Sequence, residues 1–171
     1  MSKDKLEFVS AIITNDEGNV LILKRRKDLK LDPGKYDLCS GHMKEGEIPT
    51  QTMYREIREE IGVMQEEIKK IEKLGQITTP HEKLNNTTTH MYLIQIDLSE
   101  DEINKRLKNV QEPEMENAQY VKNLNILRNV QKYSDFMRSI YTEELEKVFR
   151  NVQEKLNDRE ELKRKQWEEE R

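Results

Sequence analysis

The chain contains few of the residues that mark secreted or membrane proteins. Its 171 residues include a single cysteine, Cys39. No internal disulfide can form, and a reducing compartment is expected. No apolar run is long enough for a signal peptide or a membrane span. We therefore expect a cytoplasmic protein that does not contact a membrane.

The composition also gives little support for a nucleic-acid-binding protein. Charged residues make up 37% of the chain, but both signs are interspersed and the net charge is only −4. A dominant basic face, which DNA-binding domains carry, is therefore not expected. Aromatic residues are only 6% of the chain, so few side chains can stack on a base. A small-molecule partner is expected instead of DNA, and the 5′ end of an RNA stays open as a substrate.

The order of apolar segments and turns predicts an α/β domain. Residues 8–26 read as a β-hairpin around the turn "NDEGN". A helix is expected from Pro49, which suits a first helical turn, to a left-handed cap at Gly62. A further helical turn should run through Ile71. Later segments read as two strands, a short helix capped by Ser99, and a last strand: "LGQITT", "HMYLIQIDL", "SEDEINKRL" and "NAQYV".

The C-terminal part of the chain differs in character from the rest. We expect residues 1–126 to form the main domain and residues 127–171 to form a charged helical extension without glycine or proline. Apolar side chains recur there at helical spacing: Leu145, Val148, Phe149, Val152 and Leu156. This stripe could dock on the parent domain or pair with a second copy, which would make a homodimer through the C-terminal helices.

The expected helix after Pro49 crowds carboxylates along one side. Its apolar side chains recur every four residues, at Met53, Ile57 and Ile61. Residues three and four apart share a helix face, so three glutamates should cluster beside that stripe: Glu56, Glu59 and Glu60. Carboxylates held at the edge of a core suit Mg²⁺ or Mn²⁺. The alternative is a solvated face that pairs with neighbouring arginines.

The stretch from Gly41 to Val63 resembles the Nudix box at every defined position. That box reads Gly, five residues, Glu, seven residues, then Arg-Glu-aliphatic-any-Glu-Glu-any-Gly-aliphatic. The resemblance implies an α/β/α sandwich with a mixed sheet. It also implies a Mg²⁺-dependent hydrolase that cleaves the diphosphate linkage of a nucleoside diphosphate derivative by attack of water on phosphorus.

The same resemblance assigns roles to residues. Glu56, Glu59 and Glu60 would be metal ligands, together with the backbone carbonyl of Ser40. Arg55 and Glu47 would brace the loop against the helix. Glu59, Glu60 and Arg55 are also candidates for catalysis.

A further catalytic carboxylate is expected before the last strand. Many family members carry a glutamate about six residues before an aromatic-Val pair, and here Glu114 precedes Tyr120-Val121 by six. Glu112 and Glu116 are its neighbours. Such a carboxylate could orient or deprotonate the attacking water, although a solvated acidic loop would give the same pattern.

The segment before the box resembles the isopentenyl-diphosphate-isomerase-like branch of the family. It carries an Arg-Arg strand end, a Pro-Gly turn and an aromatic-Asp pair. Isomerase chemistry is disfavoured because Ser40 stands where its cysteine belongs, and no histidine precedes His42. Arg25 and Arg26 could meet substrate phosphates, and Tyr36 could stack on a base. A third alternative keeps the fold but not the reaction: a ligand sensor or scaffold with the helical extension as its interaction surface.

Overall fold

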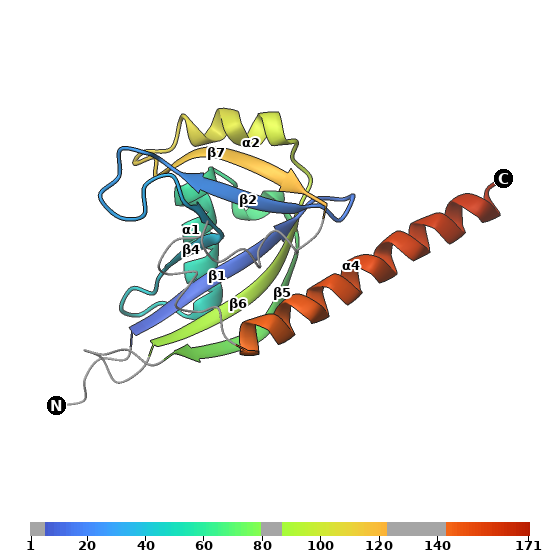
Figure 1. The fold of residues 1–171 in the computed structure, drawn as a ribbon, viewed down its shortest axis with the longest axis horizontal. Helices are drawn as coiled ribbons and strands as arrows, with labels where there is room; N and C mark the ends of the chain where they lie inside the picture. The colour runs from blue at the N-terminus through green and yellow to red at the C-terminus, as the bar shows by residue number, and fades with distance from the viewer. Residues whose placement is uncertain (1–5, 80–86, 123–142) are drawn as a thin grey trace.

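The chain folds around one mixed β-sheet with helices on both faces (Figure 1). The computed structural model describes residues 6–79, 87–122 and 143–171. The strands are β1 (Leu6–Thr14), β2 (Val20–Arg25), β3 (Tyr36–Asp37), β4 (Cys39–His42), β5 (Ile68–Thr79), β6 (Thr87–Ile96) and β7 (Met115–Val121). The helices are α1 (Pro49–Ile61), α2 (Glu100–Leu107) and α4 (Glu143–Glu169), with a short 3₁₀ turn, η1 (Gln65–Glu67).

The sheet mixes parallel and antiparallel pairs, as the sequence predicts. Its order is β3-β2-β1-β6-β5, with β4 paired to β1 and β7 paired to β2. The central pair, β1 with β6, is parallel, and the other pairs are antiparallel. The expected hairpin of β1 and β2 is confirmed by the pairing of Ile13 with Leu21.

Strand alternation divides the core between the two faces of the sheet. One face buries Val9, Ala11 and Ile13 of β1 with apolar residues of α1 and α2. The opposite face buries Ile12 of β1 with residues from β2, β6 and α4. The carboxylate-bearing helix α1 is thereby fixed on one face of the sheet, and α4 covers the other.

Two local expectations were wrong. The helical turn expected through Ile71 ends at Glu67, and β5 begins at Ile68. Ile68 and Ile71 pair with Ile96 and Ile94 of β6, so sheet pairing replaces helix there. Residues 28–37, whose sequence "DLKLDPGKYD" is typical of a loop, end in the short strand β3, and the strand β4, which the sequence does not predict, follows them.

Helix α1 begins and ends where the sequence predicts. Pro49 is its first residue, and Gly62 closes it with a φ of 68° while donating its N–H to the carbonyl of Arg58. The apolar stripe predicted from the sequence is fully buried: Met53, Ile57 and Ile61.

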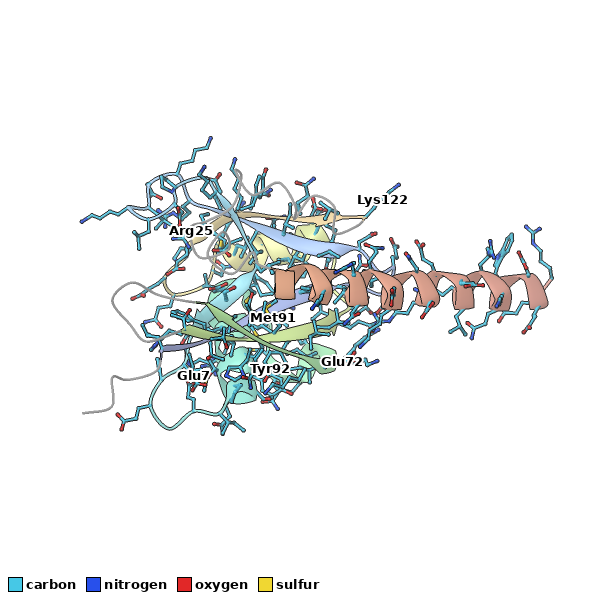
Figure 2. The ribbon with its side chains drawn as sticks, turned by 60° about the horizontal axis from the view of Figure 1, so that its bottom comes forward. Glu7, Arg25, Glu72, Met91, Tyr92 and Lys122 are labelled. Carbon is cyan, nitrogen blue, oxygen red and sulfur yellow. The ribbon has the colours of Figure 1, made fainter. Side chains whose placement is uncertain are left out.

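Helix α4 is a core element over part of its length and projects beyond the sheet over the rest (Figures 1 and 2). Val152 and Leu156 are buried in the second core cluster, and Lys155 contacts Glu72 of β5. Further along, Leu162 and Trp167 are 59% and 55% exposed. The domain boundary expected between residues 126 and 127 lies outside the described residues. Within the described part of the chain, no helix is long and apolar enough to cross a membrane.

Candidate active site

A cavity of about 500 Å³ opens between α1 and the segment that connects α2 to β7. Its lining is dominated by carboxylates from both elements, with two basic side chains: Glu56, Glu59, Glu60, Glu112, Glu114, Lys44 and Arg58, beside Val110 and Gln111. The three box glutamates are thus brought together with Glu114, although more than fifty residues separate them in sequence.

The cavity wall depends on close contact between Gly41 and Glu56. A Cβ atom added to Gly41 would lie 1.9 Å from Cδ and 2.1 Å from Oε1 of Glu56. Any side chain at position 41 would therefore occupy the space of the Glu56 carboxylate. The first glycine of the box is needed for this close approach of strand β4 to helix α1.

Arg55 joins the loop before α1 to the glutamates of the helix. Its Nε and Nη2 donate to the two carboxylate oxygens of Glu47 at 2.8 and 2.9 Å. Nη2 also donates to the carbonyl of His42 at 2.9 Å. Nη1 donates to Glu56 Oε1 at 2.8 Å and to Glu59 Oε2 at 3.1 Å. The loop brace predicted for Arg55 and Glu47 is therefore present as a bidentate ion pair.

These contacts change the protonation of both partners. The hydrogen bonds from Arg55 hold the pKa of Glu47 at about 2, against an ordinary value of 4.5. The pKa of the Arg55 guanidinium is raised, chiefly by Glu47. Both groups are charged at neutral pH, so the brace persists over the working range of the protein.

Glu60 is the carboxylate of the cavity whose charged form is most disfavoured by its surroundings. Its Oε2 atom is buried without a hydrogen-bond partner among the described residues. Loss of solvation, and then the charges of Glu56 and Asp37, raise its pKa well above the ordinary value. The adjacent Cys39 is buried in the core, and burial raises the pKa of its thiol.

Glu56 is also shielded from water, but it has a partner. Burial raises its pKa, and the ion pair with Arg55 opposes that shift. Glu59, in contrast, leaves 47% of its side chain exposed at the mouth of the cavity. The three glutamates therefore range from a closed environment at Glu60 to an open one at Glu59.

Two of the three glutamates around the start of β7 line the cavity. Glu114 and Glu112 both line it. Glu116 faces a separate hollow and pairs with Lys24 at 3.3 Å. Glu114 Oε2 lies 4.0 Å from Nη1 of Arg25.

The remaining expected residues lie around the cavity and do not line it. Ser40 is in β4 beside Gly41, and its hydroxyl oxygen lies 2.8 Å from that of Ser10. Arg25 donates two hydrogen bonds to the carbonyl of Leu31 and reaches the cavity only through Glu114. Arg26 pairs with Asp28 and donates to the carbonyl of Pro113. Tyr36 packs against the core cluster on the opposite face of the sheet.

Two charged cavity residues were missed by sequence reasoning: Lys44 and Arg58. Lys44 lies in the loop of the box, and Arg58 occupies the box position at which any residue is accepted, so the motif assigns no role to either. Helical spacing gives no signal for Arg58 either, because adjacent residues of a helix, such as Arg58 and Glu59, do not share a face.

The donor set fits a hard divalent cation. Glu60 offers a buried oxygen without a partner, and Glu56, Glu59 and Glu114 add carboxylates from two elements. Oxygen donors of this kind are the ligands that Mg²⁺ and Mn²⁺ prefer. As the side chains stand, no three acidic, histidine or cysteine groups among the described residues converge on one point. Arg55 holds Glu56 and Glu59 instead, so ion binding requires these side chains to turn toward Glu60.

Comparison with known proteins places this site in a family. The sequence model of the NUDIX domain matches residues 6–164. The chain belongs to the NUDIX domain family. The match runs through the whole sheet and well into α4.

Individual relatives are more distant. The Escherichia coli 8-oxo-dGTP diphosphatase is 31% identical over 70 residues, which are 41% of this chain and 54% of that protein. The chain thus matches about half the length of this relative. A Caenorhabditis elegans Ap4A hydrolase is similar in fold, with a TM-score of 0.59 and 16% identity over 90% of this chain and 98% of the other. A Bacillus subtilis pyrophosphohydrolase is also similar in fold, with a TM-score of 0.59 and 18% sequence identity. The match covers 89% of this chain and 84% of that protein.

Proposed function

We propose that this NUDIX protein is a Mg²⁺-dependent diphosphohydrolase that cleaves the diphosphate linkage of a nucleoside diphosphate derivative by attack of water on phosphorus. The observation that carries the proposal is the cavity lined by Glu56, Glu59, Glu60 and Glu114, with one buried carboxylate oxygen that has no partner among the described residues. An acidic cavity of this kind repels a diphosphate unless a divalent cation is present. The family to which the chain belongs supports the same reaction.

The glutamates of α1 are the groups that would hold the cation. Glu56, Glu59 and Glu60 would bind it together with the backbone carbonyl of Ser40, and Mn²⁺ could replace Mg²⁺. When bound, such an ion neutralises charge on phosphate oxygens and acidifies a bound water.

Two further residues would act beside the cation. Glu114 lies across the cavity from α1, where its carboxylate could orient or deprotonate the attacking water. Arg25 would hold Glu114 in place through the charge contact at 4.0 Å. Arg55 is a positioning residue, because its donors are occupied by Glu47, Glu56, Glu59 and the His42 carbonyl.

The substrate is best sought with a panel of diphosphate compounds, assayed with Mg²⁺ and with EDTA. The panel contains nucleoside triphosphates including 8-oxo-dGTP, dinucleoside polyphosphates, ADP-ribose, nucleotide sugars, 5′-triphosphorylated RNA and isopentenyl diphosphate. We expect Mg²⁺-dependent cleavage of one class, with phosphate or a nucleotide as product. Absence of cleavage across the panel, with Mg²⁺ still bound, would contradict the hydrolase and favour a ligand-binding protein.

A further inference from the structure

Two cations at the mouth of the carboxylate cavity have no role in holding the fold. Lys44, in the loop between β4 and α1, and Arg58, on α1, both line the cavity and are exposed. Across the described ranges 6–79, 87–122 and 143–171, neither side chain forms a hydrogen bond or an ion pair. Both charges are therefore available to a ligand.

Arg55, on the same helix, differs from Arg58 because its hydrogen-bond donors are already bound by protein acceptors. Its side chain is only 13% exposed, and its guanidinium donates to three carboxylates and a carbonyl. A substrate phosphate could reach those donors only by displacing Glu47, Glu56 or Glu59. Arg58 lies one helical turn from Arg55 and has none of these partners.

The position of Arg58 directs its charge toward the cavity mouth. It directly precedes Glu59 in α1, and it also lines a second hollow of about 280 Å³ between α1 and η1. Tyr54 and Met64 form part of that second hollow. Arg58 therefore belongs to the lining of both hollows, and its exposed side chain is accessible from each.

We propose that Arg58 and Lys44 form an anion site that holds a phosphate group of the substrate at the mouth of this cavity. The inference rests on the proposed diphosphohydrolase function and adds the groups that bind its substrate. The lining of the cavity carries five carboxylates and only these two cations. A diphosphate that enters is repelled by the carboxylates, and Arg58 and Lys44 are the side chains that offset this repulsion. Arg58 can also donate two parallel hydrogen bonds to one phosphate.

The test compares KM and kcat for five variants on the best substrate of the panel. Arg58→Ala should raise KM about tenfold with kcat changed by less than about twofold, because the lost contact exists before and during the reaction. Arg58→Lys should recover part of the loss, since it keeps the charge but not the paired donors. Lys44→Ala should raise KM about threefold, and Arg58→Ala should also weaken the dependence of KM on salt.

Lys122→Ala is the matched control. Lys122 is an exposed lysine just beyond the end of β7, at the opposite end of the β2–β7 pair from Arg25 (Figure 2). Its replacement should change neither KM nor the salt dependence. Unchanged KM in the Arg58→Ala, Lys44→Ala double variant would overturn the anion site. A loss of kcat at constant KM would also overturn it, because Arg58 would then act through Glu59 and not on substrate.

Failure of the proposed function is distinguished by a binding measurement. If the wild-type protein cleaves no compound, binding of inorganic pyrophosphate in the presence of Mg²⁺ is measured by calorimetry. A Kd at least about fivefold weaker in the double variant than in Lys122→Ala supports the anion site on its own. An equal Kd overturns it.

Discussion

Glu60 is a carboxylate whose burial lowers the stability of the folded protein. Its carboxylate is cut off from water and lies near the charges of Glu56 and Asp37, which together raise its pKa. The folded protein therefore binds the Glu60 proton more tightly than the unfolded chain does. The contribution of Glu60 to the free energy of unfolding is largest below its ordinary pKa of 4.5, and it falls as pH rises through the folded-state pKa.

We accordingly predict that Glu60→Gln stabilises the metal-free protein at high pH. In EDTA at pH 8, the free energy of unfolding should be higher for Glu60→Gln than for wild type, because the amide carries no charge to desolvate. The difference should shrink as pH falls toward 4.5. Urea unfolding across this range measures it. Lower stability of Glu60→Gln at pH 8, or a gap independent of pH, would show that burial does not penalise this carboxylate.

Gly41 gives a second prediction at the same scale. Gly41→Ala should lower the free energy of unfolding by about 2 kcal/mol or more, because its methyl group overlaps the Glu56 carboxylate. Turnover should fall with it, since Glu56 is displaced from the cavity. Gly46→Ala is the control: Gly46 has a φ of 82° with nothing within 4 Å of an added Cβ. That variant should lose only about 1 kcal/mol and keep its turnover. Equal turnover in both variants would show that the close contact between Gly41 and Glu56 is not needed for activity.

At the scale of elements, the sequence predicts α1 well because several signals coincide there. Pro49, the stripe ending at Ile61 and the cap at Gly62 each mark the same helix, and the structure follows them. Strands β3 and β4 escaped prediction because each is too short to show alternation. Their existence depends on pairing with β2 and β1, which no local pattern encodes.

The same reason limits prediction of the candidate site. The three box glutamates follow from helical spacing, and Glu114 follows only from the family resemblance. Arg58 could not be singled out, because its availability depends on Arg55 taking the neighbouring acceptors. Tyr36 was expected near the substrate, but strand alternation directs it to the other face of the sheet.

Helix α4 offers a paired test of what an element contributes. Leu156 is buried against the sheet and Leu162, six residues later, is 59% exposed. Leu156→Ala should therefore lower the free energy of unfolding by about 2–4 kcal/mol, whereas Leu162→Ala should change it by less than about 0.5 kcal/mol. Urea denaturation of both variants checks this. Equal effects would mean that α4 does not cover the sheet as described.

At the scale of the whole molecule, α4 decides how much of the chain is needed to fold. A chain that ends at residue 142 loses Val152 and Leu156 from one of the two core clusters. We predict that it will not unfold cooperatively, because one face of the sheet is left uncovered. A chain that ends at Arg164 removes the projecting end of α4 and should match wild type within about 0.5 kcal/mol. Cooperative unfolding of the shorter chain at wild-type stability would refute this.

In the proposed reaction, the carboxylates of α1 hold the Mg²⁺ ion on which cleavage of a diphosphate depends. The most direct test is kcat with Mg²⁺ for wild type, Glu59→Gln and Glu66→Gln on the best substrate of the panel. Glu66 is the control because it is an exposed glutamate like Glu59 but lines the hollow between α1 and η1 and not the carboxylate cavity. We predict a loss of about a hundredfold or more in Glu59→Gln and none in Glu66→Gln, with both variants folded. Turnover of folded Glu59→Gln within about threefold of wild type would contradict the assignment of these carboxylates to the reaction.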